Sequence, residues 1–341
     1  ILDLQLFYAG PDDGFAKDFF RDEKIVFIPI GSGKLRNYFS VKNFIDFFKL
    51  ASGIFQALWS IFFIMPDVIF SKGGYGALPA VIAAAVFRLP LIVHDSDAIP
   101  GKVNHFSARF ASRIGIAFQS AVDFFPPEKT ASVGVPIRKH IFGGNKEEAR
   151  ERLDILSEAP AVGIIGGSRG SQKMNEAVLG VLKELTDEFE IIHQTGAENH
   201  EGVAGEARVI LESGHREHYH SFPFLDEGRI RDFYAASDLV VSRASATIIF
   251  EIAAWGKPAI LIPLRQAAQD HQRKNAYEYA GGGAAMIIEE ANLSPHILLS
   301  EIKKILSSPD QMKKMSEAAQ RFARIDSAEI IAREILKLGI H

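Results

Sequence analysis

Short apolar runs that alternate with longer helical patterns constrain the fold of this chain more than any other feature. Helical stretches separate most of these runs, an alternation typical of βαβ units and of parallel sheets with helices on both faces. Uninterrupted apolar runs such as 91–93 and 259–262 fit strands buried on both sides. The pattern therefore predicts an α/β fold, with strand candidates at 24–30, 67–72, 89–95, 161–167, 189–194, 237–242 and 258–263.

A break near the middle of the chain predicts two domains. The length of 341 residues suggests about two domains. Pro136 and the Gly143–Gly144 pair interrupt the pattern before a charged helical stretch. We expect Rossmann-like domains at 1–140 and 141–322. The last segment, 323–341, is expected to form a helix that packs back toward the first domain.

Composition excludes several classes of function. A net charge of −4 argues against nucleic acid as the main partner. The absence of cysteine excludes disulfides, thiolate nucleophiles and Cys-ligated zinc, and it fits a reducing cytoplasm. No pattern of a secretory signal follows Ile1. The longest apolar run, Ile54–Met65, is expected to be too short to cross a bilayer.

A glycine-rich turn is the sharpest motif. The apolar run ending at Ile165 leads into GGSRG (166–170), and a helix is expected from about Gln172. Glycines allow a ligand to approach the backbone closely, and the free N–H groups of a helix start favour a pyrophosphate. Ser168 offers a further hydroxyl donor. By spacing alone, a ligand site and a plain tight turn are equally compatible with this motif.

Two later segments carry polar residues where open α/β sheets bind ligands. The stretch 242–263 predicts a loop, a helix with Glu251 and a strand, and a carboxylate so placed can accept hydroxyl hydrogen bonds from a ribose. A capping or surface role for Glu251 is the simpler alternative. In DHQRKNA (270–276), Gln272 and Asn275 share one helical face. Either can recognise sugar hydroxyls or cap a helix.

Two short motifs suggest ligands that their spacing does not support. GSGK (31–34) lacks the first glycine and the final Ser or Thr of a nucleotide-binding P-loop, so we do not expect ATP binding. HREHYH (215–220) matches no zinc pattern, and we interpret it as a solvated loop.

A phenylalanine-rich helix is expected at 41–64. Its aromatic residues recur at helical spacing, which favours a buried layer helix. The alternative is a membrane-facing helix. Basic residues that could contact an anionic membrane lie before and within it, namely Lys34, Arg36, Lys42 and Lys49.

Taken together and in order, these motifs resemble the MurG family of glycosyltransferases. GGSRG with Asn175 is similar to the family's GGSxGA…N loop, HQTG (193–196) to its HQ[ST]G, and GVPIR (134–138) to its hinge. SRASATIIFEIAAWGKPAILIP and DHQRKNA are similar to its RxGAxTxxE…G-x-P and DHQxxNA. In the N-terminal half, SKGGYGALPAVIAA (71–84) and HDSDAIPGKVN (94–104) are looser matches. The resemblance covers nearly the whole chain.

The resemblance implies a GT-B fold, in which two Rossmann-like domains face each other across a cleft. It implies an inverting transfer of N-acetylglucosamine from UDP-GlcNAc to a lipid-linked muramyl-peptide acceptor, at the cytoplasmic face of the plasma membrane. The nucleotide sugar is a substrate, and neither a cofactor nor a metal is expected. The implied substrate-binding residues are Arg138, Gly167, Ser168, Gly170, Leu225, Ala246, Thr247, Ile248, Glu251, Gln272 and Asn275.

Departures from the family pattern affect the catalytic assignment. The family's GGTGGH loop, with its candidate general-base histidine, has no counterpart, and Ile1 falls where the second strand is expected. Asp97 replaces the asparagine of HEQN and is the one catalytic candidate that remains. The alternatives are another glycolipid-forming transferase, a non-hydrolysing UDP-sugar epimerase, and a catalytically impaired UDP-sugar-binding homologue.

Overall fold

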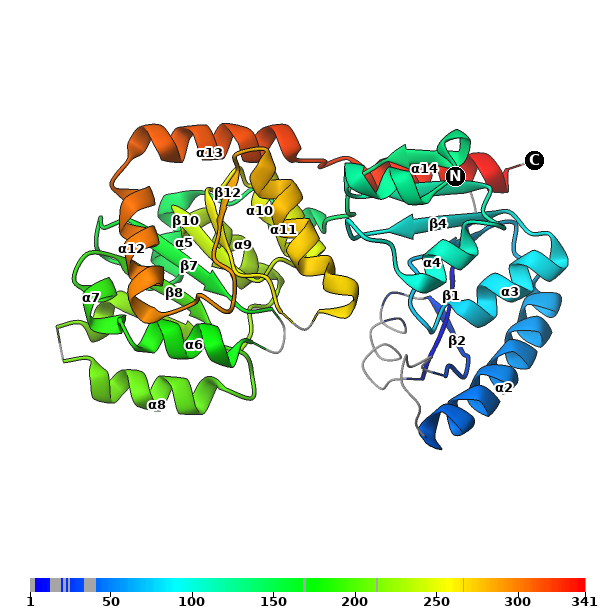
Figure 1. The fold of residues 1–341 in the computed structure, drawn as a ribbon, viewed down its shortest axis with the longest axis horizontal. Helices are drawn as coiled ribbons and strands as arrows, with labels where there is room; N and C mark the ends of the chain where they lie inside the picture. The colour runs from blue at the N-terminus through cyan, green and yellow to red at the C-terminus, as the bar shows by residue number, and fades with distance from the viewer. Residues whose placement is uncertain are drawn as a thin grey trace. The chain divides into compact units, whose positions relative to one another are not determined.

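The computed structural model describes residues 4–12, 20, 23, 25–33, 41–167, 170–212, 214–265 and 267–340. The chain divides into two compact units, each with its own parallel sheet (Figure 1). Unit 1 comprises Ile1–Val133 and Glu329–His341, and unit 2 comprises Gly134–Ala328.

Unit 2 contains a six-stranded parallel sheet in the order β12-β11-β10-β7-β8-β9. The first strand, β7, lies between β8 and β10, so the two halves of the sheet wind outward from it. This is the Rossmann order, whose ligands bind beside the carboxyl ends of the strands at the point of reversal. The strands are β7 (Ala161–Ile165), β8 (Glu190–Gln194), β9 (Tyr219–Phe222), β10 (Leu239–Ser242), β11 (Ala259–Leu261) and β12 (Ala285–Ile287).

The helices of unit 2 begin at side chains suited to capping. Ser171, Asp226 and Ser294 each accept a hydrogen bond from the backbone N–H three residues on, which satisfies a donor left unpaired at a helix start. The helices are α5 (Lys146–Arg152), α6 (Gln172–Leu179), α7 (Leu182–Thr186), α8 (His200–Ile210), α9 (Glu227–Ala236), α10 (Ala246–Ala254), α11 (His271–Gly281), α12 (Pro295–Leu306) and α13 (Pro309–Phe322). Short 3-10 helices are η3 (Lys139–Ile141), η4 (Arg216–His218) and η5 (Ala268–Asp270).

Unit 1 contains a parallel pair of strands, β1 (Phe7–Gly10) and β2 (Val26–Pro29), and a four-stranded parallel sheet. The sheet runs in sequence order through β3 (Ile69–Ser71), β4 (Leu91–Asp95), β5 (Arg113–Ile116) and β6 (Thr130–Ser132). The helical segments are α2 (Val41–Ile64), α3 (Leu78–Phe87), α4 (Lys102–Ser107), η1 (Gln119–Phe124), η2 (Pro127–Lys129) and, from Glu329 on, α14 (Ser327–Gly339). An ion pair of 2.8 Å from Arg113 to Glu334 holds α14 against β5.

Helix α2 packs through small residues, with α3 beside it (Figure 1). Ala57 and Ile61 are buried against the alanines of α3. A Cβ on Gly53 would lie 1.7 Å from the carbonyl oxygen of Gly31, so the backbones touch. The glycines of the GSGK motif thus serve helix packing.

The outer face of α2 is aromatic and exposed. Phe44, Phe55 and Phe63 are each at least 67% exposed, and Phe47, Phe48, Trp59 and Phe62 are more than half exposed. The prediction of a buried layer helix is therefore wrong for most of the phenylalanine stripe. The helix also contains the stretch Asp46–Ile64, 19 residues with a mean hydropathy of 1.6 and 17% of it buried, which by length and composition could cross a membrane. The expectation that no segment is long enough is wrong on length.

The structure confirms the seven strand candidates to within three residues at each end and adds five strands. The additions are β1, β5, β6, β9 and β12. The interpretation of HREHYH as a solvated loop is wrong, because η4 and β9 occupy most of it and its histidines contact carboxylates. His218 and His220 lie 2.8 and 2.9 Å from Glu190, and His215 lies 2.7 Å from Asp187.

Candidate functional site

The glycine-rich turn joins the central strand of unit 2 to α6. Gly167 and Gly170 have φ angles of +85° and +71°, which glycine adopts without strain. The Gly170 N–H donates to the Gly167 carbonyl at 2.8 Å and closes the turn. Nothing lies within 4 Å of a Cβ built on Gly167, so this glycine borders open space. Ser168 lies outside the described residues.

A cavity of about 440 Å³ opens beside this turn, at the carboxyl ends of β7 and β10. The β7–α6 connection contributes Gly166, Gly167, Gly170, Ser171, Gln172 and Lys173. The start of the β10–α10 segment contributes Arg243, Ser245 and Ile248, and Leu264, Gln272 and Glu290 complete the wall. The strand order places this cavity at the point of reversal, where a Rossmann domain binds its nucleotide.

Arg243 and Glu290 set the charge of the cavity. Arg243 Nη2 donates to Glu290 Oε1 and to the Ser171 hydroxyl, each at 2.6 Å. Burial alone would raise the pKa of Glu290, but the hydrogen bond and charge of Arg243, with the Arg265 N–H and Lys173, lower it below its ordinary value. Among the described residues that line it, the cavity thus has two cations and one carboxylate. No sequence motif points to Glu290, and Arg243 lies inside a motif that assigns it no role.

Glu251 is buried on α10, three residues after Ile248, which lines the cavity. Its Oε2 accepts a hydrogen bond of 2.9 Å from the Tyr234 hydroxyl, and the side chain is 5% exposed. Burial raises the pKa of Glu251, while the Tyr234 hydrogen bond and the charge of Arg138 oppose that rise. Arg138 pairs with Glu227 at 3.3 Å. The structure therefore groups Arg138 with Glu251, and neither residue lines the cavity.

The other expected substrate residues are divided between the cavity and its supports. Ile248 and Gln272 line it, and Gln272 Oε1 accepts from the Leu264 N–H at 3.0 Å. Asn275 is fully buried and donates to the Ala244 carbonyl at 3.4 Å, which supports the loop before α10. Leu225 and Ala246 are buried and Thr247 is exposed, at the N-terminal ends of α9 and α10. None of these last four residues lines the cavity.

Unit 1 has its own polar cluster at the carboxyl ends of β3 and β4. The Lys72 ammonium lies 3.1 Å from His94 Nδ1 and 2.9 Å from the Ser96 hydroxyl. Burial lowers the pKa of Lys72, and the carboxylates of Asp95 and Asp97 act in the opposite direction. Asp97 therefore does not present an isolated negative charge, because a lysine lies beside it. Sequence reasoning missed Lys72, since its role depends on the next strand.

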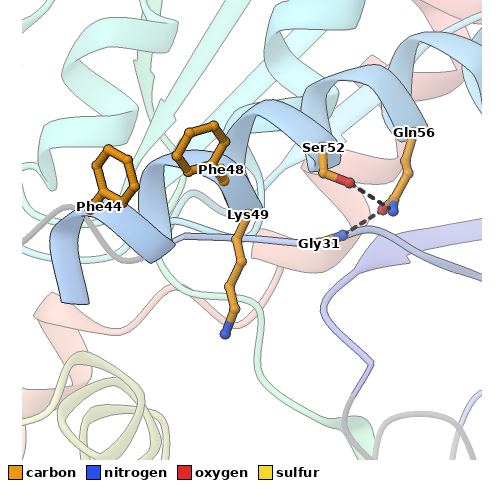
Figure 2. Close-up of a pocket in the computed structure, with 6 residues that line it drawn as sticks. All are labelled: Gly31, Phe44, Phe48, Lys49, Ser52 and Gln56. Atoms are coloured by element: carbon orange, nitrogen blue, oxygen red, sulfur yellow. Dashed lines mark hydrogen bonds between the residues drawn. The ribbon is translucent and has the colours of Figure 1, made fainter. Parts of the chain in front are cut away.

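A second cavity, of about 640 Å³, lies in unit 1 beside the N-terminal half of α2 (Figure 2). Gln56 interrupts the apolar run of this helix for a structural reason. Its Oε1 accepts from the Gly31 N–H at 2.9 Å, and its Nε2 donates to the Ser52 hydroxyl at 3.3 Å. Phe44, Phe48 and Lys49 also line this cavity.

Comparison with known proteins agrees with the fold. Residues 161–330 match the glycosyltransferase family 28 C-terminal domain and residues 4–116 match its N-terminal domain. The crystal structure of Acinetobacter baumannii MurG has a TM-score of 0.75 at 25% identity, covering 98% of this chain and 91% of that chain. A structure of a putative UDP-N-acetylglucosamine 2-epimerase from Listeria monocytogenes has a TM-score of 0.69 at 15% identity, a likeness of fold alone that covers 98% of this chain and 87% of that chain. The family match and the fold thus define a UDP-sugar glycosyltransferase of the GT-B type.

Relatives define the family more narrowly. A protein of Legionella pneumophila (strain Paris) is 34% identical over 329 residues, which is 96% of this chain and 88% of that protein. Its name is UDP-N-acetylglucosamine–N-acetylmuramyl-(pentapeptide) pyrophosphoryl-undecaprenol N-acetylglucosamine transferase. The chain belongs to the MurG family of glycosyltransferases.

Proposed function

We propose that this enzyme transfers N-acetylglucosamine from UDP-GlcNAc, with inversion, to a lipid-linked muramyl-pentapeptide during peptidoglycan precursor synthesis. The observation that carries the proposal is the glycine turn and cationic cavity at the sheet's point of reversal. The names of the relatives supply the donor and the acceptor.

The donor diphosphate is proposed to bind at the start of α6. The leaving UDP gains negative charge as the glycosidic bond breaks, and preorganised donors stabilise that charge. The N-terminal N–H groups of α6, Lys173 and Arg243 are such donors on the cavity wall. Gln272, on the same wall, is proposed to contact the sugar, and Glu251 with Arg138 to contact the nucleoside.

The same donors support a reaction without an obligatory metal. Cationic side chains and a helix N-terminus can neutralise a diphosphate, which is the role a divalent cation has in other transferases. We therefore expect turnover to persist in EDTA. Turnover abolished by EDTA and restored by Mg²⁺ would contradict this proposal.

We further propose that unit 1 binds the cytoplasmic face of the membrane peripherally through α2. The exposed aromatic face of the helix includes an apolar strip built from the stacked pair Phe55–Trp59 and the edge-on pair Trp59–Phe63. Exposed apolar strips of this kind favour membrane or protein contact. The inner face packs on α3, which supports a helix lying at the interface, with a lipid-linked acceptor as the reason to bind there.

Of the four basic residues expected to contact an anionic membrane, Lys49 is the one whose side chain the structure describes on this helix. Lys34 and Arg36 lie outside the described residues, as does the side chain of Lys42. Lys49 lines the cavity beside the N-terminal half of α2 together with Phe44 and Phe48. A cation beside exposed aromatic side chains is suited to an anionic lipid surface.

The proposed reaction is tested by UDP release from a panel of UDP-sugars, with and without a lipid-linked muramyl-pentapeptide. We expect release only with UDP-GlcNAc and acceptor together. Conversion of the UDP-sugar without acceptor would indicate an epimerase, and UDP binding without turnover would indicate an impaired homologue.

A further inference from the structure

Three polar side chains from three elements of unit 2 form a continuous chain of hydrogen bonds. His193 on β8 lies 3.0 Å from the Tyr219 hydroxyl through Nδ1 and 3.0 Å from Asn175 Oδ1 through Nε2. Asn175, on α6, lies 3.0 Å from the Thr195 carbonyl through Nδ2. His193, Asn175 and Thr195 are each at most 3% exposed. Such buried polar groups stabilise a structure when every member is paired.

The Thr195 carbonyl determines the direction of every bond in this chain. A carbonyl oxygen only accepts, so the Asn175 amide must present its nitrogen to Thr195 and its oxygen to His193. His193 Nε2 must then carry a hydrogen, and its Nδ1 accepts from the Tyr219 hydroxyl. Burial lowers the pKa of His193 to about 3, with the charge of His200 acting in the same direction. The ring is therefore neutral at physiological pH, and each group keeps its role as hydrogen-bond donor or acceptor.

The series of hydrogen bonds ends at the Thr195 carbonyl, which lies against the glycine turn. A Cβ on Gly170 would lie 2.0 Å from the Thr195 carbonyl oxygen, so Gly170 packs directly on the atom that Asn175 binds. Asn175 also ties α6 itself to the end of β8. The position of the turn and the direction of the first turn of α6 thus depend on the same hydrogen-bonded carbonyl.

We propose that His193 and Asn175 are positioning residues for the donor diphosphate. His193 orients the Asn175 amide, the amide holds the Thr195 carbonyl and α6 together, and this contact sets where the N–H groups at the start of α6 point. The inference rests on the proposed function, in which the diphosphate binds at the start of α6. Neither residue lines the cavity, so each acts through the backbone.

The test measures affinities for UDP and for uridine by calorimetry in Asn175→Asp. The aspartate can still accept from His193 but has no N–H for Thr195. We expect UDP affinity to fall by about tenfold, on the scale of one lost hydrogen bond to a charged group, with uridine affinity unchanged. Thr186→Val is the matched control, since it removes a buried hydroxyl bonded within α7, away from the turn. It should lower Tm and leave the ratio of the two affinities unchanged.

A second pair of variants serves if Asn175→Asp does not fold. His193→Gln retains an N–H that can reach Asn175, whereas His193→Phe retains neither polar atom. We expect His193→Phe to lose the preference for UDP over uridine and His193→Gln to retain most of it. Equal losses for UDP and uridine, or an unchanged preference in Asn175→Asp and His193→Phe, would overturn the inference alone. A wild-type protein that binds UDP no better than uridine would overturn the proposed diphosphate site itself.

Discussion

Arg243 Nη2 and Glu290 Oε1 lie 2.6 Å apart in the wall of the cavity, and both side chains are less than a tenth exposed. Breaking a buried ion pair by removing one partner leaves an uncompensated charge, which typically costs about 3–5 kcal/mol of stability. Lys173 still lies 3.7 Å from Glu290 in Arg243→Met, so we expect a loss of stability somewhat below that scale. UDP binding should also weaken, because the cation nearest the Glu290 carboxylate is gone.

The double variant Arg243→Met with Glu290→Gln separates these two effects. It should recover much of the stability, because no unpaired charge remains, yet UDP binding should stay weak. Chemical denaturation and calorimetry measure the two quantities. Full recovery of UDP affinity in the double variant would show that Arg243 makes no favourable contact with the nucleotide.

Glu251 is expected to bind the nucleoside, although Tyr234 occupies one of its oxygens. Replacing Glu251 by alanine removes a hydrogen bond to a charged group and should weaken UDP by roughly 1.5–3 kcal/mol. Glu206→Ala is the control, because Glu206 is exposed on α8 in the same unit and has no part in the proposed site. UDP affinity that is unchanged in Glu251→Ala would remove Glu251 from the site.

Strands made of continuous apolar residues are predictable from the sequence. Elements whose polar side chains pair with residues distant in sequence are not. Strand β9 reads as a loop because its sequence, YHSF, is half polar, and its polar side chains pair with His193 and Glu190. The role of Arg243 is hidden for a similar reason, since Glu290 is distant in sequence. An ion pair between residues far apart in the sequence leaves no periodic pattern from which it could be predicted.

The aromatic helix illustrates a different limit. Helical spacing correctly predicts Val41–Ile64 as one element. Periodicity identifies an apolar face, but it does not say which face is covered by the rest of the protein. In α2 the covered face is the one with Gly53 and Ala57, because small residues allow the backbone of Gly31 to approach. Most of the aromatic residues therefore lie on the uncovered face.

The buried carboxylate of Glu190 should make the free energy of unfolding depend on pH. Burial alone would raise its pKa, but hydrogen bonds from His220, Ser157 and His218 outweigh burial and lower the pKa from 4.5 to about 2. A depressed folded-state pKa contributes stability that is present above the unfolded value and is lost as pH falls from about 4.5 toward 2, on the order of 3 kcal/mol in total.

Glu190→Gln tests this dependence. The variant should be less stable at pH 7, and its free energy of unfolding should fall less steeply than that of the wild type between about pH 4.5 and pH 2. Urea titrations at several pH values measure the difference. Glu206→Gln, at an exposed position of α8, should follow the wild type. A Glu190→Gln slope equal to the wild-type slope would rule out the depressed pKa.

Membrane binding should depend on the outer face of α2. Phe55 and Trp59 are 68% and 60% exposed, so replacing both by serine removes apolar surface without opening the core. We expect Phe55→Ser with Trp59→Ser to reduce co-sedimentation with anionic liposomes strongly. Lys49→Glu should reduce it in a salt-dependent way, since a basic residue near an anionic leaflet contributes about 1 kcal/mol.

Leu156→Ser is the control for non-specific adsorption to vesicles, because Leu156 is an apolar side chain that is 92% exposed in unit 2. Its co-sedimentation should equal that of the wild type. If the wild-type protein ignores anionic vesicles at low salt, or the α2 double variant binds them equally well, the aromatic face has another partner.

The transfer reaction itself tests the proposed function most directly. UDP-GlcNAc labelled in the sugar is incubated with the enzyme and a lipid-linked muramyl-pentapeptide, and the products are separated into lipid and aqueous phases. We predict that label enters the lipid phase in equimolar amount with released UDP, and that NMR of the product shows a β linkage. Label that stays in the aqueous phase as free or epimerised nucleotide sugar, with the acceptor unchanged, would contradict the proposed function.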